Sequence, residues 1–279
     1  MAPVNSIGIM QGRVLPEYLD RLQIFPASRW ELELAEISSL GFDCVELLYD
    51  RSLECRRIYF ESKEAQGFLS EQNRKRRLPI AESMCVDYLA SVSALTSRDR
   101  FMSHLAGLIE TVGGTALKTL VIPFVEENEI RDRRSLDAVL QALQETGLAD
   151  RAMKRDLALA LEIPLPASEI LESFSKFATF EYRVCLDLGN TRAMGLEPEK
   201  EIMQLGTRIC HVHVKDRPVG GPNVLLGDGD VNFHETFRAL RTVGYGGPLI
   251  LETSYFRDPP GEALKNLRFV NAALEAVKS

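Results

Sequence analysis

Four apolar segments in the second half of the chain each carry a potential metal ligand at or near their end. These ligands are Glu162, Asp187, His213 and Glu252. Three carboxylates buried together would repel one another in a medium of low dielectric constant, so their burial requires a compensating cation. Three carboxylate oxygens and one imidazole nitrogen suit Zn²⁺, Mn²⁺, Co²⁺ or Mg²⁺, and they leave positions open for water or a substrate. The pattern therefore predicts a site for one divalent metal ion.

The choice of histidine follows from the spacing of two histidines in one segment. His211 and His213 are separated by one apolar residue, so both side chains point to the same side of a strand. His213 lies nearer the end of the segment and is the predicted ligand, whereas His211 lies one layer deeper and supports it or packs. His104 and His234 fall in helical stretches and are expected at the surface. A strand-end acid or a core histidine is ordinary by itself, so the prediction depends on four successive segments sharing the feature.

Short apolar runs rich in strand-forming residues alternate with longer helical segments along the whole sequence. Alternating strands and helices predict right-handed βαβ units and a parallel sheet, and eight such units favour a closed (β/α)8 barrel. We therefore predict an α/β protein with a single TIM barrel domain over residues 1–279. An open, doubly wound sheet is the alternative, but no G-x-G-x-x-G follows the first strand. The predicted strands are about Ser6–Met10, Cys44–Leu48, Leu78–Cys85, Leu117–Pro123, Leu157–Glu162, Arg183–Asp187, Ile209–Lys215 and Pro248–Thr253.

Helical periodicity and end signals mark four of the intervening segments. Ser28 and Glu31 form a predicted capping box, and glycines end two of the helices. Because residues at the carboxyl ends of barrel strands face the active-site mouth, these helices and strands would bring the four ligands together. The predicted helical segments are bounded by Ser28 and Gly41, Arg98 and Val112, Ser135 and Gly147, and Phe233 and Val243.

Length and composition favour one folded domain and argue against a nucleic-acid or membrane partner. The 279 residues are typical of one α/β barrel, and the net charge of −7 argues against a nucleic-acid-binding surface. The basic run Arg74–Arg77 is expected to be a solvated helix end. No apolar run reaches the ~18 residues of a membrane span, and no secretory signal is visible. Five scattered cysteines without a CxxC pair indicate small buried side chains in a reducing cytoplasm.

Several segments resemble the xylose isomerase-like superfamily of sugar isomerases and epimerases, and most closely its L-ribulose-5-phosphate 3-epimerase branch. The resemblance implies that the four residues named above bind the metal ion and that Glu162 and Glu252 also form an acid–base pair. One glutamate would remove the C3 proton of a ketose, the metal would stabilise a cis-enediolate, and the other would return a proton to the opposite face. It also implies a homo-oligomer. The matching segments are Gly41–Glu46, Leu159–Glu162, Cys185–Asn190, His211–Asp216, Gly227–Phe233 and Ile250–Glu252.

Five further residues are predicted to contact a sugar or sugar phosphate substrate. Lys215 and Arg217 follow the ligand histidine and would hold a phosphate or hydroxyl group, unless they form only a solvated turn. Asn190 would contact a substrate hydroxyl or orient Asp187. Glu46 would bind a hydroxyl or pair with Arg13, and Arg13 itself would reach a phosphate.

Three other functions use the same kind of barrel. A lyase similar to inosose dehydratase would use the same metal and glutamates to eliminate water from a cyclic polyol ketone. A non-catalytic sugar-binding barrel would lack part of the metal site. A trinuclear zinc site of the endonuclease IV type is excluded, because four histidines are too few to assemble it. Aldose–ketose isomerisation stays open, since moving a proton between C1 and C2 needs similar groups.

Overall fold

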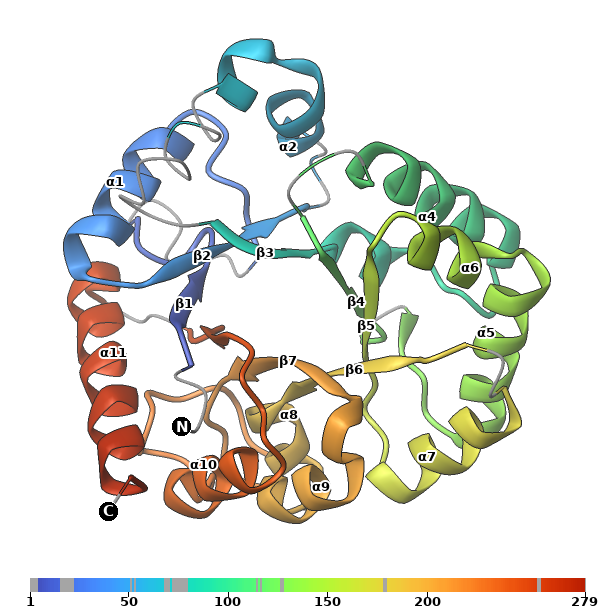
Figure 1. The fold of residues 1–279 in the computed structure, drawn as a ribbon. Helices are drawn as coiled ribbons and strands as arrows, with labels where there is room; N and C mark the ends of the chain where they lie inside the picture. Colours follow the sequence, from blue (N-terminus) through green and yellow to red (C-terminus); the bar gives the residue numbers. More distant parts are fainter. Residues whose placement is uncertain are drawn as a thin grey trace.

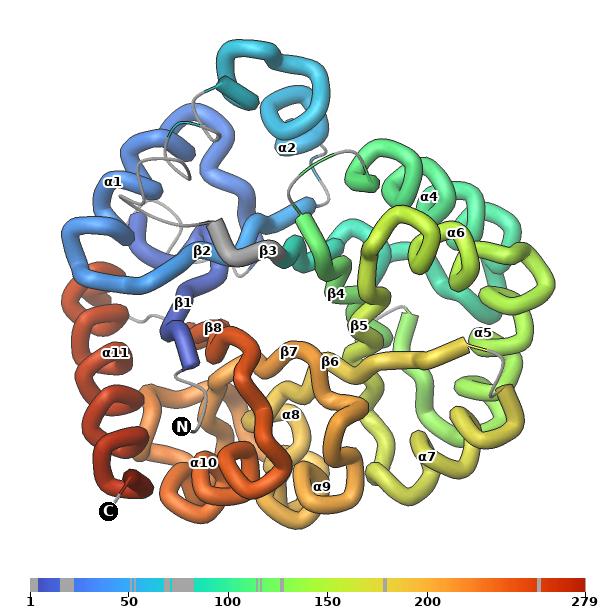
Figure 2. The backbone as a smooth tube through the Cα atoms, in the orientation of Figure 1, coloured from blue at the N-terminus to red at the C-terminus, as the bar shows by residue number. Residues whose placement is uncertain are grey.

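Eight parallel strands close into a barrel with helices around it, as Figure 1 shows for the computed structural model. The structure describes residues 5–15, 23–50, 52, 54–67, 71, 80–113, 115, 117–125, 128–177, 180–254 and 257–278. The strands follow one another around the barrel in sequence order, and β8 pairs with β1 to close it (Figure 2). This confirms the predicted (β/α)8 barrel and excludes the open sheet. The strands are β1 (Ile7–Met10), β2 (Cys44–Leu48), β3 (Ile80–Cys85), β4 (Thr119–Pro123), β5 (Ala158–Glu162), β6 (Arg183–Asp187), β7 (Ile209–Val214) and β8 (Leu249–Leu251).

The helices pack their apolar faces against the outside of the barrel, where they bury the larger of two hydrophobic clusters. Among the described residues, no helix combines the length and the apolar character needed to span a bilayer. The α-helices are α1 (Trp30–Leu40), α2 (Glu54–Arg56), α4 (Arg98–Val112), α5 (Arg133–Glu145), α6 (Leu148–Lys154), α7 (Ala167–Lys176), α8 (Leu188–Ala193), α9 (Pro198–Leu205), α10 (Phe233–Thr242) and α11 (Pro259–Ala276). Shorter turns are the π-helix η2 (Arg57–Glu61) and the 3₁₀ helices η3 (Asp87–Ser91) and η5 (Gly206–Arg208).

Small and medium side chains fill the inside of the barrel. Space is tight there, because a Cβ atom added to Gly8 would lie 2.6 Å from both Cys44 Sγ and Ile250 Cδ1. None of the five cysteines forms a disulfide, and burial raises the pKa of the Cys44 thiol to about 12. The cysteines are therefore small apolar side chains here, as predicted. The inner cluster consists of Met10, Cys44, Leu48, Cys85, Val121, Ala160, Cys185 and Ile250.

Two predicted helix starts are wrong. The chain first makes a turn in which Arg29 N donates to Pro26 O, so α1 begins at Trp30 and Ser28 does not cap it. Its predicted end at Gly41 is confirmed, because Gly41 adopts a left-handed conformation with φ 91°. The other wrong start is that of α5, predicted at Ser135. This helix is capped by Asp132, whose side chain accepts a hydrogen bond from Ser135 N. Gly147 precedes α6, a helix that the sequence pattern did not separate from α5.

Two other expectations concern the outer surface. His234 is exposed, as predicted. His104 is half-buried instead, and its ring stacks on Tyr88 with centroids 5.0 Å apart. The basic run 74–77 and the first two residues of the third predicted strand lie outside the described residues.

Candidate active site

The ends of β5 to β8 bring the four predicted metal ligands together. One ligand atom from each of Glu162, Asp187, His213 and Glu252 can be chosen so that all lie within 4.8 Å of one another, and all four residues are buried. The strand register explains part of this arrangement, since Asp187 on β6 lies directly beside His213 on β7. The other two ligands come from the flanking strands, at the end of β5 and just after β8.

The ring of His213 is oriented as in a metal-binding histidine. Its Nε2 lies 2.9 Å from Glu46 Oε1, while its Nδ1 lies 3.0 Å from Glu252 Oε2 and 3.9 Å from Glu162 Oε2. Metal-bound histidines usually donate their second ring N–H to a carboxylate. A proton on Nε2 shared with Glu46 leaves the Nδ1 lone pair directed at the two glutamates. Nδ1 is buried and makes no hydrogen bond of good geometry within the described part of the chain.

Glu46 lies deeper than predicted, and its carboxylate contacts the two histidines of β7. Its Oε1 binds His213, its Oε2 lies 2.7 Å from His211 Nε2, and its side chain has no exposed surface. Burial alone would raise the pKa of Glu46, but the two imidazoles hold it below its usual range. Glu46 does not line the active-site cavity, and neither of its oxygens pairs with Arg13. Both predicted roles of Glu46, substrate contact and pairing with Arg13, are therefore wrong.

Lys215 reaches into the cluster of ligands. Its Nζ lies 2.8 Å from Asp187 Oδ2 and 3.0 Å from Glu252 Oε2. The close approach requires Gly189, because a Cβ atom there would lie 2.9 Å from Lys215 Cβ. The ammonium group is thus bound to protein carboxylates, although the side chain still lines the cavity. The predicted alternative of a solvated turn is wrong for Lys215, which is buried.

The formal charges of the site sum to a negative value that a divalent cation would balance. Glu46, the three acidic residues of the cluster and the two cations in direct contact with that cluster, Lys215 and Arg13, sum to two negative charges when the carboxylates are ionised and the histidines neutral. His213 Nδ1 is buried without a hydrogen bond of good geometry in the described residues, and the partner of the buried Asp187 Oδ2 there is the Lys215 ammonium group. One ion carrying two positive charges would balance the site and bind both atoms, so the donor set fits the predicted metal.

The two glutamates of the cluster differ in electrostatic surroundings. Burial, together with the neighbouring Asp187 and Glu252 carboxylates, raises the pKa of Glu162 to about 7. Burial also opposes ionisation of Glu252, but Lys215 and His213 hold the pKa of Glu252 well below its usual range. The asymmetry arises because Lys215 binds Glu252 directly, whereas no cation lies within ion-pair distance of Glu162 among the described side chains apart from the His213 ring.

A cavity of about 600 Å³ opens above these residues, a volume typical of small-molecule sites. It combines the polar groups of the cluster with an apolar wall that includes Val125, Ile130 and Met194. Of the predicted site residues, it is lined by Arg13, Glu162, Asn190, Lys215, Arg217 and Glu252.

Arg13 and a residue that the sequence did not point to, Gln23, hold Glu252. Arg13 Nη2 donates to Gln23 Oε1 at 2.6 Å and lies 3.4 Å from Glu252 Oε1, to which Gln23 Nε2 donates at 2.7 Å. The turn that carries Arg13 is fixed from below by Glu33, which accepts hydrogen bonds from the N–H groups of Gly12 and Arg13 at 2.8 and 3.0 Å. Gln23 has φ 58° and lies in no periodic pattern, so no sequence signal marks it.

Asn190 and Arg217 hold Glu162 in a similar way. Asn190 Nδ2 donates to Glu162 Oε1 at 3.0 Å, and Arg217 Nη1 donates to Asn190 Oδ1 at 2.9 Å. The side chain of Asp187 caps α8 by accepting a hydrogen bond from Asn190 N at 2.7 Å. The Asn190 side chain binds Glu162 instead of Asp187, and its contact with a substrate hydroxyl stays a prediction. Arg217 also binds Gly221 O, and thus forms part of an ordered loop.

The loop after β7 is organised by Asp216, to which the sequence assigned no role. Its fully buried carboxylate accepts hydrogen bonds from the N–H groups of Gly227, Gly229 and Val231 at 2.9 to 3.1 Å. A Cβ atom at Gly229 would collide with Asp216 Oδ1, so a glycine is needed there. The recurring glycines of this loop are the signal that could have revealed the contact.

Residues 34–273 match the family described as xylose isomerase-like TIM barrel. The chain belongs to this family. It is 26% identical over 269 residues to a putative L-ribulose-5-phosphate 3-epimerase, UlaE, of Shigella dysenteriae serotype 1 (strain Sd197), covering 89% of this chain and 92% of that protein. The predicted resemblance is therefore confirmed, and with it the prediction of an enzyme of the isomerase and epimerase class.

Two solved structures share the fold of this chain. An L-ribulose 3-epimerase superposes with a TM-score of 0.73 at 17% identity, covering 99% of this chain and 96% of that one. An IolI protein with a bound zinc atom superposes with a TM-score of 0.73 at 15% identity, covering 98% and 99%. At these identities the likeness shows the fold, and the barrel of the present chain matches both along nearly its whole length.

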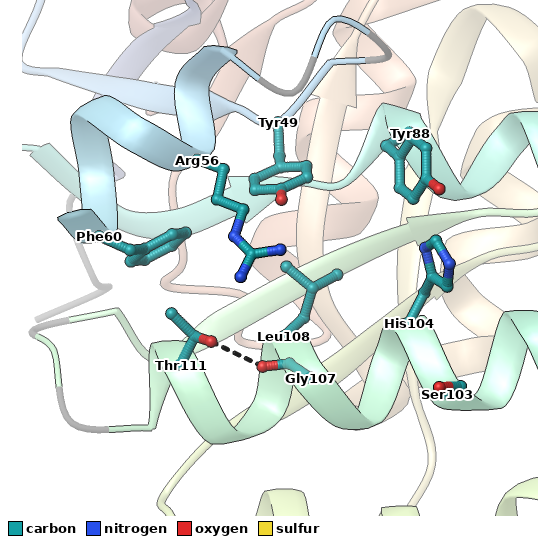
Figure 3. Close-up of a pocket in the computed structure, with 9 residues that line it drawn as sticks. All are labelled: Tyr49, Arg56, Phe60, Tyr88, Ser103, His104, Gly107, Leu108 and Thr111. Carbon is teal, nitrogen blue, oxygen red and sulfur yellow. Dashed lines mark hydrogen bonds between the residues drawn. The ribbon is translucent and has the colours of Figure 1, made fainter.

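A second, smaller cavity of about 250 Å³ lies beside the barrel mouth of this xylose isomerase-like protein, between η2 and α4 (Figure 3). The rings of Tyr49, Phe60 and Tyr88 and the guanidinium group of Arg56 line it. It shares no lining residue with the larger cavity, although Asp87 lines the large cavity and its neighbour Tyr88 the small one. The 3₁₀ helix η3 thus separates the two, and two of the four predicted metal ligands, Glu162 and Glu252, line the larger.

Proposed function

We propose that this protein is a divalent-metal-dependent epimerase that inverts C3 of a ketose or ketose phosphate. The observation that carries the proposal is the placement of two glutamates around one imidazole. Glu162 ends β5 and Glu252 follows β8, three strands further around the barrel, yet each has an oxygen within 4 Å of His213 Nδ1. Two carboxylates that reach one site from separate strands can act on two faces of a bound sugar.

The metal ion would be held by Glu162, Asp187, His213 and Glu252. A divalent ion there would act as a Lewis acid, polarising the ketose carbonyl and stabilising the negative charge that develops when the C3 proton leaves. Zinc, manganese, cobalt and magnesium all suit this donor set.

The glutamates perform the proton transfers in this proposal. One carboxylate removes the proton from C3, which leaves an enediolate on the sugar. The other, in its protonated form, returns a proton to C3 from the opposite face, and the configuration is inverted. Asn190, Gln23 and Arg217 line the same cavity and offer polar groups to the sugar hydroxyls. The UlaE relative, named for L-ribulose 5-phosphate, supports a five-carbon ketose phosphate as the first substrate to test.

Exchange of the C3 proton with solvent tests the proposal. The metal-loaded protein would be incubated in D₂O with L-ribulose, with L-ribulose 5-phosphate and with a panel of other ketoses, and followed by NMR. We expect deuterium at C3 together with the C3 epimer, and loss of both in Glu252→Gln. Deuterium at C1 or C2 would instead indicate aldose–ketose isomerisation, and loss of water with a new carbonyl absorption would indicate a lyase. A metal-loaded protein that exchanges no proton in any of these sugars would contradict enzymatic activity of this kind.

A further inference from the structure

Each of the two glutamates is held by the same kind of hydrogen-bonded chain. Arg13 donates to the carbonyl oxygen of Gln23, whose amide nitrogen donates to Glu252 Oε1, and Arg13 Nη2 also lies 3.4 Å from Glu252 Oε1 itself. Arg217 donates to the carbonyl oxygen of Asn190, whose amide nitrogen donates to Glu162 Oε1. The two chains share no residue and lie at different parts of the barrel mouth, one beside β8 and β1 and the other beside β5 and β6.

A carboxamide suits the middle of such a chain, because it accepts through its oxygen and donates through its nitrogen. An arginine can only donate hydrogen bonds, so it fixes which end of the amide is the oxygen. The amide nitrogen must then face the glutamate, which accepts. A carboxylate in the same place would present an acceptor to an acceptor, and an apolar side chain of the same size would present nothing. The arrangement therefore depends on Gln23 and Asn190 being amides rather than on their size.

In each chain the amide nitrogen donates to Oε1 of the glutamate and leaves Oε2 free for another contact. The amides bind Oε1, and in each case the other oxygen, Oε2, faces His213 Nδ1, at 3.0 Å from Glu252 and 3.9 Å from Glu162. A glutamate carboxylate otherwise rotates readily about its last torsion, because that torsion is broad and nearly twofold. With Oε1 held by an amide, the carboxylate plane is fixed and Oε2 stays directed at the metal position.

We propose that Gln23 and Asn190 are the positioning residues of the two glutamates, each held in turn by its arginine. This inference rests on the proposed epimerase function for its catalytic consequence, since the same two carboxylates would have to bind the ion and transfer protons. Hydrogen bonds from neighbouring residues fix the orientation of a metal ligand, and the loss of one typically reduces metal affinity or activity tenfold to a hundredfold.

The test uses Gln23→Met and Asn190→Leu, which keep the approximate size of the side chain and remove the amide. In the full-length, metal-loaded protein we expect kcat for C3 epimerisation to fall about tenfold to a hundredfold in each variant, with KM changed by less than about threefold. Mn²⁺ affinity, measured by competition with a chelator and without substrate, is expected to weaken by about tenfold in each. The control is Gln141→Met, because Gln141 Nε2 makes a similar bond to Glu145 Oε1 at 2.7 Å on the exposed surface of α5.

Double-mutant cycles on Mn²⁺ affinity separate positioning from a general loss of structure. If Arg217 acts through Asn190, adding Arg217→Met to Asn190→Leu should weaken Mn²⁺ affinity little further. Arg217→Lys in the wild-type background keeps a hydrogen-bond donor, so it should weaken Mn²⁺ affinity less than Arg217→Met. Gln23→Met and Asn190→Leu lie in different chains, so their effects should multiply. Multiplying effects of Arg217→Met and Asn190→Leu, or a rise in KM with kcat unchanged, would overturn the proposal. If the wild type has no epimerase activity, the proposed function fails, whereas the affinity cycles still decide whether the two amides position the glutamates.

Discussion

Acidic residues at the strand ends of the two halves of the barrel have different surroundings. In the second half, Glu162, Asp187 and Glu252 lie close to one another and to one imidazole, and the two glutamates line a cavity. In the first half, Glu46 has no exposed surface and both its oxygens face histidine nitrogens. Glu33, at the start of the first helix, is also fully buried and accepts hydrogen bonds from backbone N–H groups. An acid that faces protein donors is satisfied, whereas acids that face one another need a cation.

The first half of the barrel therefore supports the second. Glu46 crosses from β2 to hold the ring of His213, and Glu33 fixes the turn that carries Arg13, which lies 3.4 Å from Glu252. If this division is correct, the same substitution of an acid by its amide should have different consequences in the two halves. Three such substitutions test it, at a proposed ligand, at a residue that holds a ligand, and at a residue that holds the backbone.

The largest effect is expected for Asp187→Asn. The amide keeps the shape and can still accept the hydrogen bond from Asn190 N, but it removes a negative charge and a ligand oxygen from the cluster. Because this change removes a direct ligand, metal affinity should fall by more than about a hundredfold, beyond the range of outer hydrogen-bond losses. Elemental analysis of the purified proteins after incubation with divalent ions would measure it, with about one equivalent expected in the wild type.

The control for Asp187→Asn is Asp156→Asn. Asp156 pairs with Lys118 on the surface and has φ 58°, a conformation that asparagine adopts readily. A wild type that binds no divalent ion even in excess would mean that the carboxylates are balanced in some other way. Equal metal content in Asp187→Asn and the wild type would remove Asp187 from the ligand set.

A smaller effect is expected for Glu46→Gln. The amide can accept from one histidine but presents its NH₂ group to the other, so the ring of His213 is held less firmly and its Nδ1 becomes a weaker ligand. Metal affinity should fall tenfold to a hundredfold, with about one equivalent still bound at saturation. Chelator competition measures this affinity. A loss as large as that of Asp187→Asn would place Glu46 among the ligands and erase the distinction between the two halves.

The convergence of Glu162, Asp187, His213 and Glu252 could be predicted from the sequence because a local rule applies there. The carboxyl ends of parallel strands meet at one mouth, so the last residues of four apolar runs converge without any knowledge of side-chain contacts. Each predicted strand begins and ends within about two residues of the observed strand, because buried parallel strands read as short apolar runs. Similar reasoning failed for Glu46, which also lies near the end of a strand. Its partners, His211 and His213, follow it by more than 160 residues, and only the closed barrel brings them together.

The missed contacts have a common physical origin. Gln23 lies in a loop with a positive φ, where no hydrophobic period exists to indicate its direction. Lys215 is predicted from the sequence to contact a substrate or to be a solvated charge, yet the absence of a side chain at Gly189 lets it reach two carboxylates. The helix starts predicted at Ser28 and Ser135 failed because a cap depends on the backbone angles of its residue, which neighbouring turns determine. Side-chain networks and caps are decided by three-dimensional geometry that residue types alone do not specify.

The smallest of the three effects is expected for Glu33→Gln, and it should appear in stability rather than in metal binding. Burial raises the pKa of the Glu33 carboxyl from 4.5 to about 7, although the N–H groups of Gly12 and Arg13 favour its ionised form. A carboxyl whose pKa is higher in the folded than in the unfolded protein stabilises the fold fully below pH 4.5, and this contribution is lost as the pH rises to about 7. The amide has no charge to bury, and its carbonyl oxygen can still accept both hydrogen bonds.

Urea unfolding at pH 5 and pH 8, in chelator so that metal binding does not contribute, measures this difference. Relative to the wild type, the free energy of unfolding of Glu33→Gln should improve by about 1 to 3 kcal/mol between the two pH values. Titrations common to both proteins cancel in the comparison. Glu31→Gln, an exposed position in the first turn of the same helix, controls for removing a charge from α1. Parallel pH profiles for Glu33→Gln and the wild type would show that Glu33 keeps its charge when buried, as the three acids around His213 would have to do with a metal ion. The buried acids of the two halves would then differ only in the groups that they contact.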